Sequence, residues 1–244
     1  MNAVTEKDQK LFEWVQERAK HYEPNTEVQA AIAQKSIILV IGPAGVGKSF
    51  ISRRVTETDP GFSELGTIST RPPKPDDPEN YRTGVPIEEF AQKVMEGELV
   101  QFHRHQFTGE LYGSDLASQP TNHIVTPALA DSVGQFGQVG YRRVIPVGLY
   151  APADQWMERL QPRKKDFDYG ERLREALKVL GYLEGNLSNM PVYKNETNKG
   201  IEIARSIVNL TQREDFDRSS YKTRDSIGLM KIAAHRELEG LSRE

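Results

Sequence analysis

The stretch SIILVIGPAGVGKS, residues 36–49, joins a continuous apolar run to a glycine-rich turn that ends in lysine and serine. The apolar run, 36–41, is short and rich in β-branched residues, which is typical of a strand buried on both faces of a parallel sheet. The residues after the turn, 49–57, predict a helix that stops before the DPG at 59–61. Strands alternate with helices along the rest of the chain, which predicts an α/β fold with a mostly parallel sheet covered on both faces.

The turn matches the spacing G-x-x-x-x-G-K-[ST] through Gly42, Gly47, Lys48 and Ser49. Glycines let backbone N–H groups converge on a phosphate, and the helix that follows presents the positive end of its dipole. A lysine at this place puts a point charge on the β- and γ-phosphate oxygens, and the Ser49 hydroxyl is expected to ligate Mg²⁺. The sequence therefore predicts a P-loop that binds the phosphates of a nucleotide together with Mg²⁺. Motors, GTPases, sulfotransferases and small-molecule kinases all carry such loops, so the loop alone does not decide the function. The loop residues expected to bind the nucleotide, which is ATP in the kinase interpretation given below, are Gly42, Pro43, Ala44, Gly45, Val46, Gly47, Lys48, Ser49 and Phe50.

Composition narrows the classes of partner. The 244 residues carry 32 Lys and Arg against 35 Asp and Glu, a formal net charge of -3, so no global basic field favours nucleic acid. The chain has no cysteine, which excludes disulfides and thiolate chemistry. Its charged N-terminus lacks an apolar leader core, and its apolar runs are strand-sized. We expect a cytoplasmic protein with no nucleic-acid partner and no membrane partner.

Helical patterns extend beyond both ends of the alternating region. Near the N-terminus, Leu11 and Val15 fall on one face of a predicted helix. Near the C-terminus, Ile227, Met230 and Ala234 do the same in an amphipathic segment of mixed charge. The C-terminal helix is expected to pack on its own core or on a second subunit, so a homodimer through the terminal helices is one expectation.

Several segments after the P-loop share their order and spacing with one family. A strand leads into a proline-rich loop, an acidic helix follows a tyrosine, and a Y-G-S turn follows a second strand. The chain resembles guanylate kinases over about residues 36–212. The segments that carry the resemblance are GTISTRPPKP (66–75), NYRTGVPIEEF (80–90), GELVQFHRHQFTGELYGS (97–114), MERLQPRKK (157–165) and GERL (170–173).

The resemblance implies a P-loop NTPase fold with a small subdomain for a nucleoside monophosphate (NMP) and a helical lid. The domain boundaries it suggests are a helical extension at 1–35, a guanylate kinase-like domain at 36–212 and a helical tail at 213–244. Within the domain, the NMP-binding part is expected at about 66–120 and the lid at about 155–175.

The resemblance also assigns roles to the residues that match the family's motifs. Arg71 is implied as the main clamp on the acceptor phosphate, and Lys74 stands where the family has a second arginine. Lysine keeps the charge but loses the planar fork that grips two oxygens. Tyr81 and Tyr112 are implied as hydroxyl donors to the same phosphate, and Ser114 as a contact to the base.

Lid and donor contacts follow from the same resemblance. Arg163 and Arg172 map to the lid arginines, which would neutralise charge on the transferring phosphoryl group, and Arg159 lies one helical turn before Arg163. Asn195, in VYKNET (192–197), is implied as a contact to the adenine of the donor.

Two departures from the family concern the acceptor base and the metal. Gln101 stands where the family's guanine-reading glutamate is expected. An amide presents one acceptor and one donor, which suits the edge of thymine, uracil or adenine better than guanine. Thr126 and Ala128 replace an acidic pair at the end of a core strand, one member of which would read the base and one of which would lie near the metal.

These observations favour an ATP-dependent kinase for a (deoxy)nucleoside monophosphate, guanylate kinase-like with a changed base preference. Two alternatives stay open. One is an ATP-binding or protein-interaction module that has lost efficient transfer, and the other is a phosphokinase for a sugar phosphate.

Overall fold

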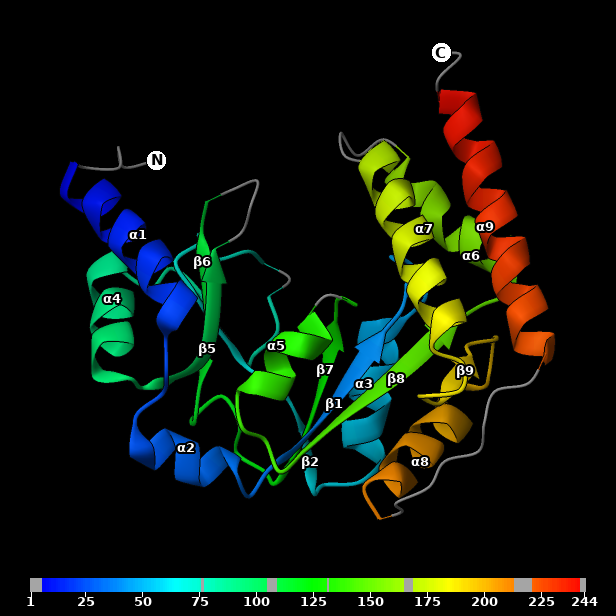
Figure 1. The fold of residues 1–244 in the computed structure, drawn as a ribbon. Helices are drawn as coiled ribbons and strands as arrows, with labels where there is room; N and C mark the ends of the chain where they lie inside the picture. The colour runs from blue at the N-terminus through cyan, green and yellow to red at the C-terminus, as the bar shows by residue number, and fades with distance from the viewer. Residues whose placement is uncertain are drawn as a thin grey trace.

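The computed structural model describes residues 6–75, 77–104, 109–130, 132–164, 169–212 and 221–241. The chain forms two sheets with helices around them (Figure 1).

A five-stranded parallel sheet forms the centre of the molecule, in the order β2-β7-β1-β8-β9. Its central strand β1 is buried at every position, as its unbroken apolar sequence requires. The strands are β1 (Ser36–Ile41), β2 (Phe62–Glu64), β7 (His123–Ala128), β8 (Arg143–Tyr150) and β9 (Val192–Lys194). The predicted α/β class with a mostly parallel core sheet is confirmed.

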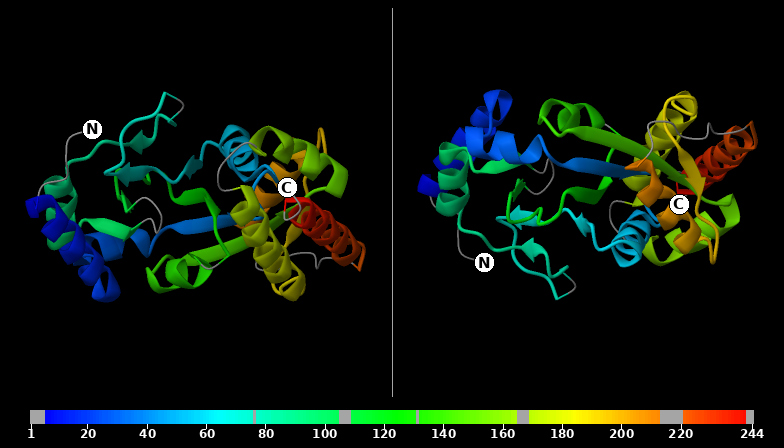
Figure 2. Two further views of the ribbon diagram at one scale, coloured as in Figure 1. Left: turned by 90° about the horizontal axis from the view of Figure 1, so that it is seen from above. Right: turned by 90° about the horizontal axis from the view of Figure 1, so that it is seen from below.

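Helices cover both faces of this sheet. The helix after the P-loop, α3 (Lys48–Thr58), packs against α8 (Gly200–Leu210) on one side. The short helix α5 (Ser132–Gln138) lies on the other side, next to β8 (Figures 1 and 2).

A second sheet stands to one side of the core, in the order β4-β3-β6-β5. Its strands are β3 (Thr67–Ser69), β4 (Tyr81–Arg82), β5 (Leu99–Arg104) and β6 (Leu111–Asp115). Helix α4 (Ile87–Glu96) buries Phe90 and Val94 in a separate apolar cluster with this sheet. The second sheet therefore has its own small core.

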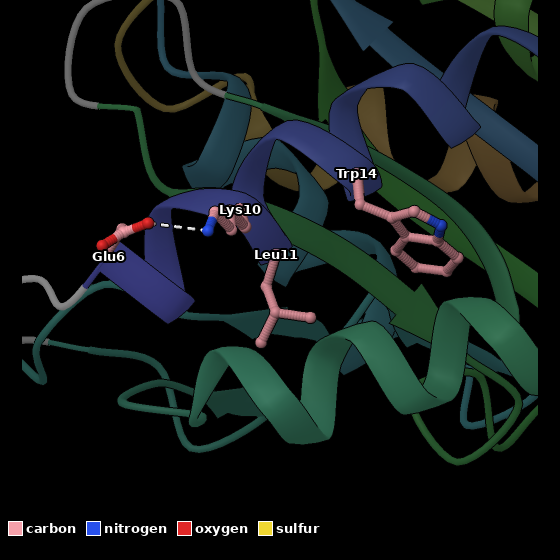
Figure 3. Close-up of a pocket in the computed structure, with 4 residues that line it drawn as sticks. All are labelled: Glu6, Lys10, Leu11 and Trp14. Carbon is pink, nitrogen blue, oxygen red and sulfur yellow. Dashed lines mark hydrogen bonds and ion pairs between the residues drawn. The ribbon is translucent and has the colours of Figure 1, made fainter.

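The N-terminal helices belong to that small core. Helix α1 (Glu6–Arg18) packs on α4 and buries Val15 completely, with Leu11 pointing toward α4 in Figure 3. A 3₁₀ turn, η1 (Ala19–His21), follows, and the Tyr22 hydroxyl donates to the Leu99 carbonyl at 2.6 Å. Helix α2 (Thr26–Ile32) then leads into β1. The sequence predicted this N-terminal segment as an extension outside the kinase-like domain. In the structure its residues Val15 and Tyr22 pack into the apolar cluster of the second sheet.

The C-terminal helix covers the opposite side of the molecule. Helix α9 (Tyr221–Leu241) lies along α7 (Tyr169–Gly185) and also contacts α6 (Ala153–Leu160), which continues into η2 (Gln161–Arg163). Its predicted apolar face is confirmed, because Ile227, Met230 and Ala234 are fully buried. That face is thus used within the chain, and a homodimer through the terminal helices stays a prediction.

Two ion pairs tie α9 to the neighbouring segments. Lys164, just after η2, pairs with Glu237, and Lys231 pairs with Glu184 of α7 at 2.5 Å. Among the described residues, no helix is both long and apolar enough to span a bilayer.

Candidate nucleotide-binding site

The glycine-rich loop leaves β1 at the carboxyl edge of the core sheet, where ligands bind in open α/β folds. Two carbonyls of the loop are held from outside. Trp156 Nε1 donates to the Ala44 carbonyl at 2.8 Å, and the Asn195 side-chain amide donates to the Val46 carbonyl at 2.7 Å. Carbonyls fixed by these donors are unavailable to repel an anion, which favours a loop that offers its N–H groups to a phosphate.

Two glycines of the loop are required by its geometry. A Cβ at Gly42 would lie 2.7 Å from the Leu149 carbonyl oxygen, so the loop packs directly on β8. Gly47 adopts a φ of 97° as the N-cap of α3, and a Cβ there would collide with the Asn195 amide. Only glycine satisfies both conditions at Gly47.

Lys48 begins α3 and folds back over the loop. Its Nζ donates to the Gly42 carbonyl at 2.6 Å and to the Pro43 carbonyl at 3.2 Å. The ammonium group is therefore placed at the mouth of the loop, where a phosphate would meet it.

The other two predicted loop contacts lie on the first turn of α3. Ser49 is exposed, and Phe50 is 47% exposed with the Arg54 guanidinium 5.2 Å from its ring centroid. Ser49 faces an open cleft of about 970 Å³ that Thr126 of β7 also lines. Tyr81 and Asp77 line the same cleft from the second sheet and its loop.

Arg71 lies at the end of β3 and is 92% buried, since only 8% of it is exposed. Its guanidinium forms a two-pronged ion pair with Asp77, and Nη1 also donates to the Pro72 carbonyl at 2.9 Å. The hydrogen bonds from Arg71 hold the pKa of Asp77 at about 2, and the pairing raises the pKa of Arg71. Lys74 is exposed at its side chain, and its backbone N–H donates to Asp77 at 2.8 Å.

Strand β6 carries two of the predicted acceptor contacts on one face. Tyr112 is opposite Ser69 of β3, and its ring stacks on His103 of β5. Burial raises the pKa of Tyr112, and the carboxylate of Glu110 raises it further. Ser114 is fully buried, and its Oγ has no hydrogen-bond partner in the described part of the chain. A buried hydroxyl without a partner is costly, which favours a ligand contact at Ser114.

Gln101 lies directly opposite Ser114, so the two share one face of the second sheet. A β-bulge between Leu99 and Gln101 shifts the register there. Leu99 belongs to the small apolar cluster and Val100 to the main core, since neighbouring residues of a strand point to opposite faces. Gln101 also lines a second open hollow, whose other walls include Tyr22, Phe102, Gln135 and Gln138.

The arginines of the predicted lid differ in how they lie relative to the glycine-rich loop. Arg163 ends η2, and its side chain lies outside the described residues. Arg172 is half-buried on the first turns of α7. Arg159 reaches the loop, because its guanidinium donates to the Val46 carbonyl at 3.4 Å and to the Asn195 carbonyl at 3.3 Å.

Asn195 itself is buried under the loop, with its amide nitrogen used by Val46. Its assignment as an adenine contact stays a prediction. Sequence reasoning missed the loop contact of Trp156 and the pairing of Asp77 with Arg71. The tryptophan lies 112 residues from its partner, and nothing in the local pattern marks it.

Comparison with known proteins supports the resemblance. A guanylate kinase of Ruegeria sp. (strain TM1040) is 35% identical over 80 residues, which cover 32% of this chain and 36% of that protein. One of Thermosynechococcus vestitus is 30% identical over 79 residues, 32% of this chain and 40% of that protein. Over these residues the chain is similar to guanylate kinases, and it shares their glycine-rich P-loop motif.

The guanylate kinase likeness covers only part of each protein, since the chain spans less than half the length of these curated relatives. The solved guanylate kinase from Anaplasma phagocytophilum matches with a TM-score of 0.50 at 16% identity, over 75% of this chain and 86% of that one, which shows the shared fold. No family model matches the chain.

Proposed function

We propose that the protein is a nucleoside monophosphate kinase that transfers the γ-phosphoryl group of ATP to a (d)NMP. The observation that carries this proposal is the cleft described above. It joins Ser49 and Thr126, at the carboxyl edge of the core sheet, to Asp77 and Tyr81 of the second sheet. A donor on the glycine-rich loop and an acceptor on the second sheet would meet across it.

The proposed reaction depends on placement and charge. An NMP phosphate is already an anionic nucleophile, so no general base is required. Lys48 would stabilise charge on the transferring group, together with Arg163 and Arg172 of the proposed lid, about 155–175. Arg71, Lys74, Tyr81 and Tyr112 would hold the acceptor phosphate in the proposed acceptor part, about 66–120.

Mg²⁺ is proposed to bind beside the glycine-rich loop with few ligands from the protein. Within the described residues, no group of three or more His, Asp or Glu is placed to hold a metal ion. Mg²⁺ commonly keeps several waters and binds substrate phosphates, so one protein hydroxyl can suffice. Ser49 would supply it, and Mg²⁺ would neutralise charge on the β- and γ-phosphates when bound.

The acceptor base is proposed to differ from guanine because Gln101 and Ser114, which pair on one face of the second sheet, would meet it as an amide and a hydroxyl. Gln101→Glu is expected to raise kcat/KM for GMP about tenfold, since one matched buried hydrogen bond is worth about 1–3 kcal/mol. Steady-state kinetics with GMP and the best natural acceptor would measure the change. Gln34→Glu, an exposed site with the same charge change, is the control. An unchanged preference would remove Gln101 from base reading.

The proposed function is tested by ADP release with ATP and Mg²⁺ against a panel of NMPs, dNMPs and ribose phosphates. Turnover with an NMP or dNMP supports the kinase and identifies its base. Turnover with a ribose phosphate alone would replace the NMP by a sugar phosphate as acceptor.

A second candidate, a weakened ATP-binding module, is favoured by one observation. Thr126 is nearly buried, and its hydroxyl donates to the neighbouring Pro127 carbonyl at 3.2 Å, while Ala128 is apolar and buried. Neither supplies the carboxylate that the resemblance leads us to expect at the end of β7. ATP binding without turnover across the whole panel would favour this module.

A further inference from the structure

The carboxylate of Asp77 is surrounded by more donors than a surface turn needs. Its Oδ2 accepts from Arg71 Nη1 at 3.0 Å, from the Lys74 backbone N–H at 2.8 Å and from Thr83 Oγ1 at 3.1 Å. Its Oδ1 accepts from Arg71 Nη2. Only 10% of the Arg71 side chain and 14% of the Asp77 side chain are exposed. These donors therefore form a largely buried site for an oxyanion at the wall of the cleft.

The same donors suit a phosphate. The guanidinium fork offers two parallel N–H groups with the geometry that carboxylate and phosphate oxygens share. A hydroxyl and a backbone N–H complete a set that could bind three oxygens. Tyr112 lies close enough to Arg71 to contribute to the raised pKa of that arginine, after the larger effect of Asp77. The unpartnered Ser114 Oγ lies two residues further along β6.

We infer that Asp77 occupies the place of the acceptor's phosphate, and that binding an acceptor transfers Arg71, the Lys74 N–H and the Thr83 hydroxyl from Asp77 to that phosphate. This inference rests on the proposed function and deepens it. It assigns Thr83 and the Lys74 backbone to the acceptor site, and it makes Asp77 an internal competitor for the substrate.

Charge explains why the exchange can occur in this direction. Asp77 carries one negative charge and stays ionised over the physiological range, because its pKa is about 2. An NMP phosphate carries close to two negative charges at neutral pH. The dianion therefore gains more from Arg71 than the carboxylate does. Asp77 lowers the affinity for the acceptor's phosphate, because it competes for the same donors. It also keeps the buried guanidinium of Arg71 paired while no acceptor is bound.

The test uses inorganic phosphate as the probe, titrated by calorimetry into the full chain. Asp77→Asn keeps the size of the side chain and removes its charge. It is expected to bind phosphate about tenfold more tightly than the wild type, the scale of one hydrogen bond to a charged group. Glu27→Gln makes the same charge change at an exposed place on α2, outside the cleft, and should leave the affinity unchanged.

The glycine-rich loop is a second place where phosphate could bind, so a double variant separates the two. The gain from Asp77→Asn should disappear when Arg71→Gln is added, because that gain depends on the guanidinium of Arg71. Any binding at the glycine-rich loop should be the same in both proteins, since neither substitution changes the loop. A gain that persists without Arg71, or an Asp77→Asn protein that binds phosphate no better than wild type, overturns the inference. If Asp77→Asn binds more weakly, Asp77 only orients Arg71.

A measurement on the wild type keeps the test independent of whether the variants fold. Saturating phosphate should speed hydrogen exchange at the backbone amides of Asp77, Glu79 and Asn80, because a displaced Asp77 releases its loop. Slower or unchanged exchange contradicts the inference. The proposed function can fail separately. If Asp77→Asn binds phosphate tenfold more tightly but no NMP is turned over, the kinase proposal is wrong and the inferred phosphate site still stands.

Discussion

Lys48→Ala is expected to lower kcat for phosphoryl transfer at least 10²–10³-fold while the protein stays folded. The ammonium is the cation that the structure places at the mouth of the loop, through its hydrogen bonds to Gly42 and Pro43. Removing one preorganised charge or donor at a developing anionic centre costs about this factor in enzymes. ADP release at saturating ATP and acceptor would measure it, with thermal unfolding recorded in parallel.

A matched control distinguishes the effect of removing Lys48 from the loop from the effect of removing any one positive charge from the protein. Lys10→Ala removes the same charge from α1, where Lys10 forms an exposed ion pair with Glu6 at 2.7 Å. Exposed pairs of this kind contribute little, so kcat and the unfolding temperature should both stay close to those of the wild type. Wild-type turnover by Lys48→Ala would refute the assigned role of the loop lysine.

Local sequence predicted the donor side of the site well. The apolar run 36–41 became β1 at the same bounds, and α3 starts at Lys48, within one residue of its predicted start. Such a loop is specified by neighbours in sequence: a buried strand before it, a helix after it, and glycines where the backbone requires them. No distant partner is needed to recognise the pattern.

Distant contacts account for what the sequence did not reveal. The donors that fix the loop's carbonyls, Trp156 and Asn195, lie 112 and 149 residues from them. Neither periodicity nor spacing carries that information. The bulge between Leu99 and Gln101 is equally hidden, because it is a shift in the register with β6, and the sequence of β5 alone does not fix that register. For α9, the pattern predicted the apolar face but not that α6 and α7 would cover it.

The Arg71–Asp77 pair shows a different limit. The partners are only six positions apart in sequence, yet the loop between them is rich in proline and follows no regular period. A charge in such a loop is usually solvated. Only the structure shows that the loop folds back and buries the pair.

Gly47→Ala is expected to weaken ATP binding about 10²-fold and to lower the unfolding temperature. A left-handed backbone costs an L-residue about 1–2 kcal/mol. The new Cβ would also displace the Asn195 amide, which donates to the Val46 carbonyl. The loop then loses both its conformation and the donor that fixes it. Titration with ATP by calorimetry, beside a thermal melt, would measure both effects.

The control for Gly47→Ala is Gly181→Ala, which adds the same methyl group far from the loop. Gly181 lies in the interior of α7, and a Cβ there meets nothing within 4 Å. Alanine in a helix interior is favoured over glycine by about 0.5–1 kcal/mol, so this variant should be slightly more stable and bind ATP normally. The same added methyl group should therefore have opposite effects at the two positions. Normal ATP affinity in Gly47→Ala would show that the loop binds no phosphate in the conformation seen here.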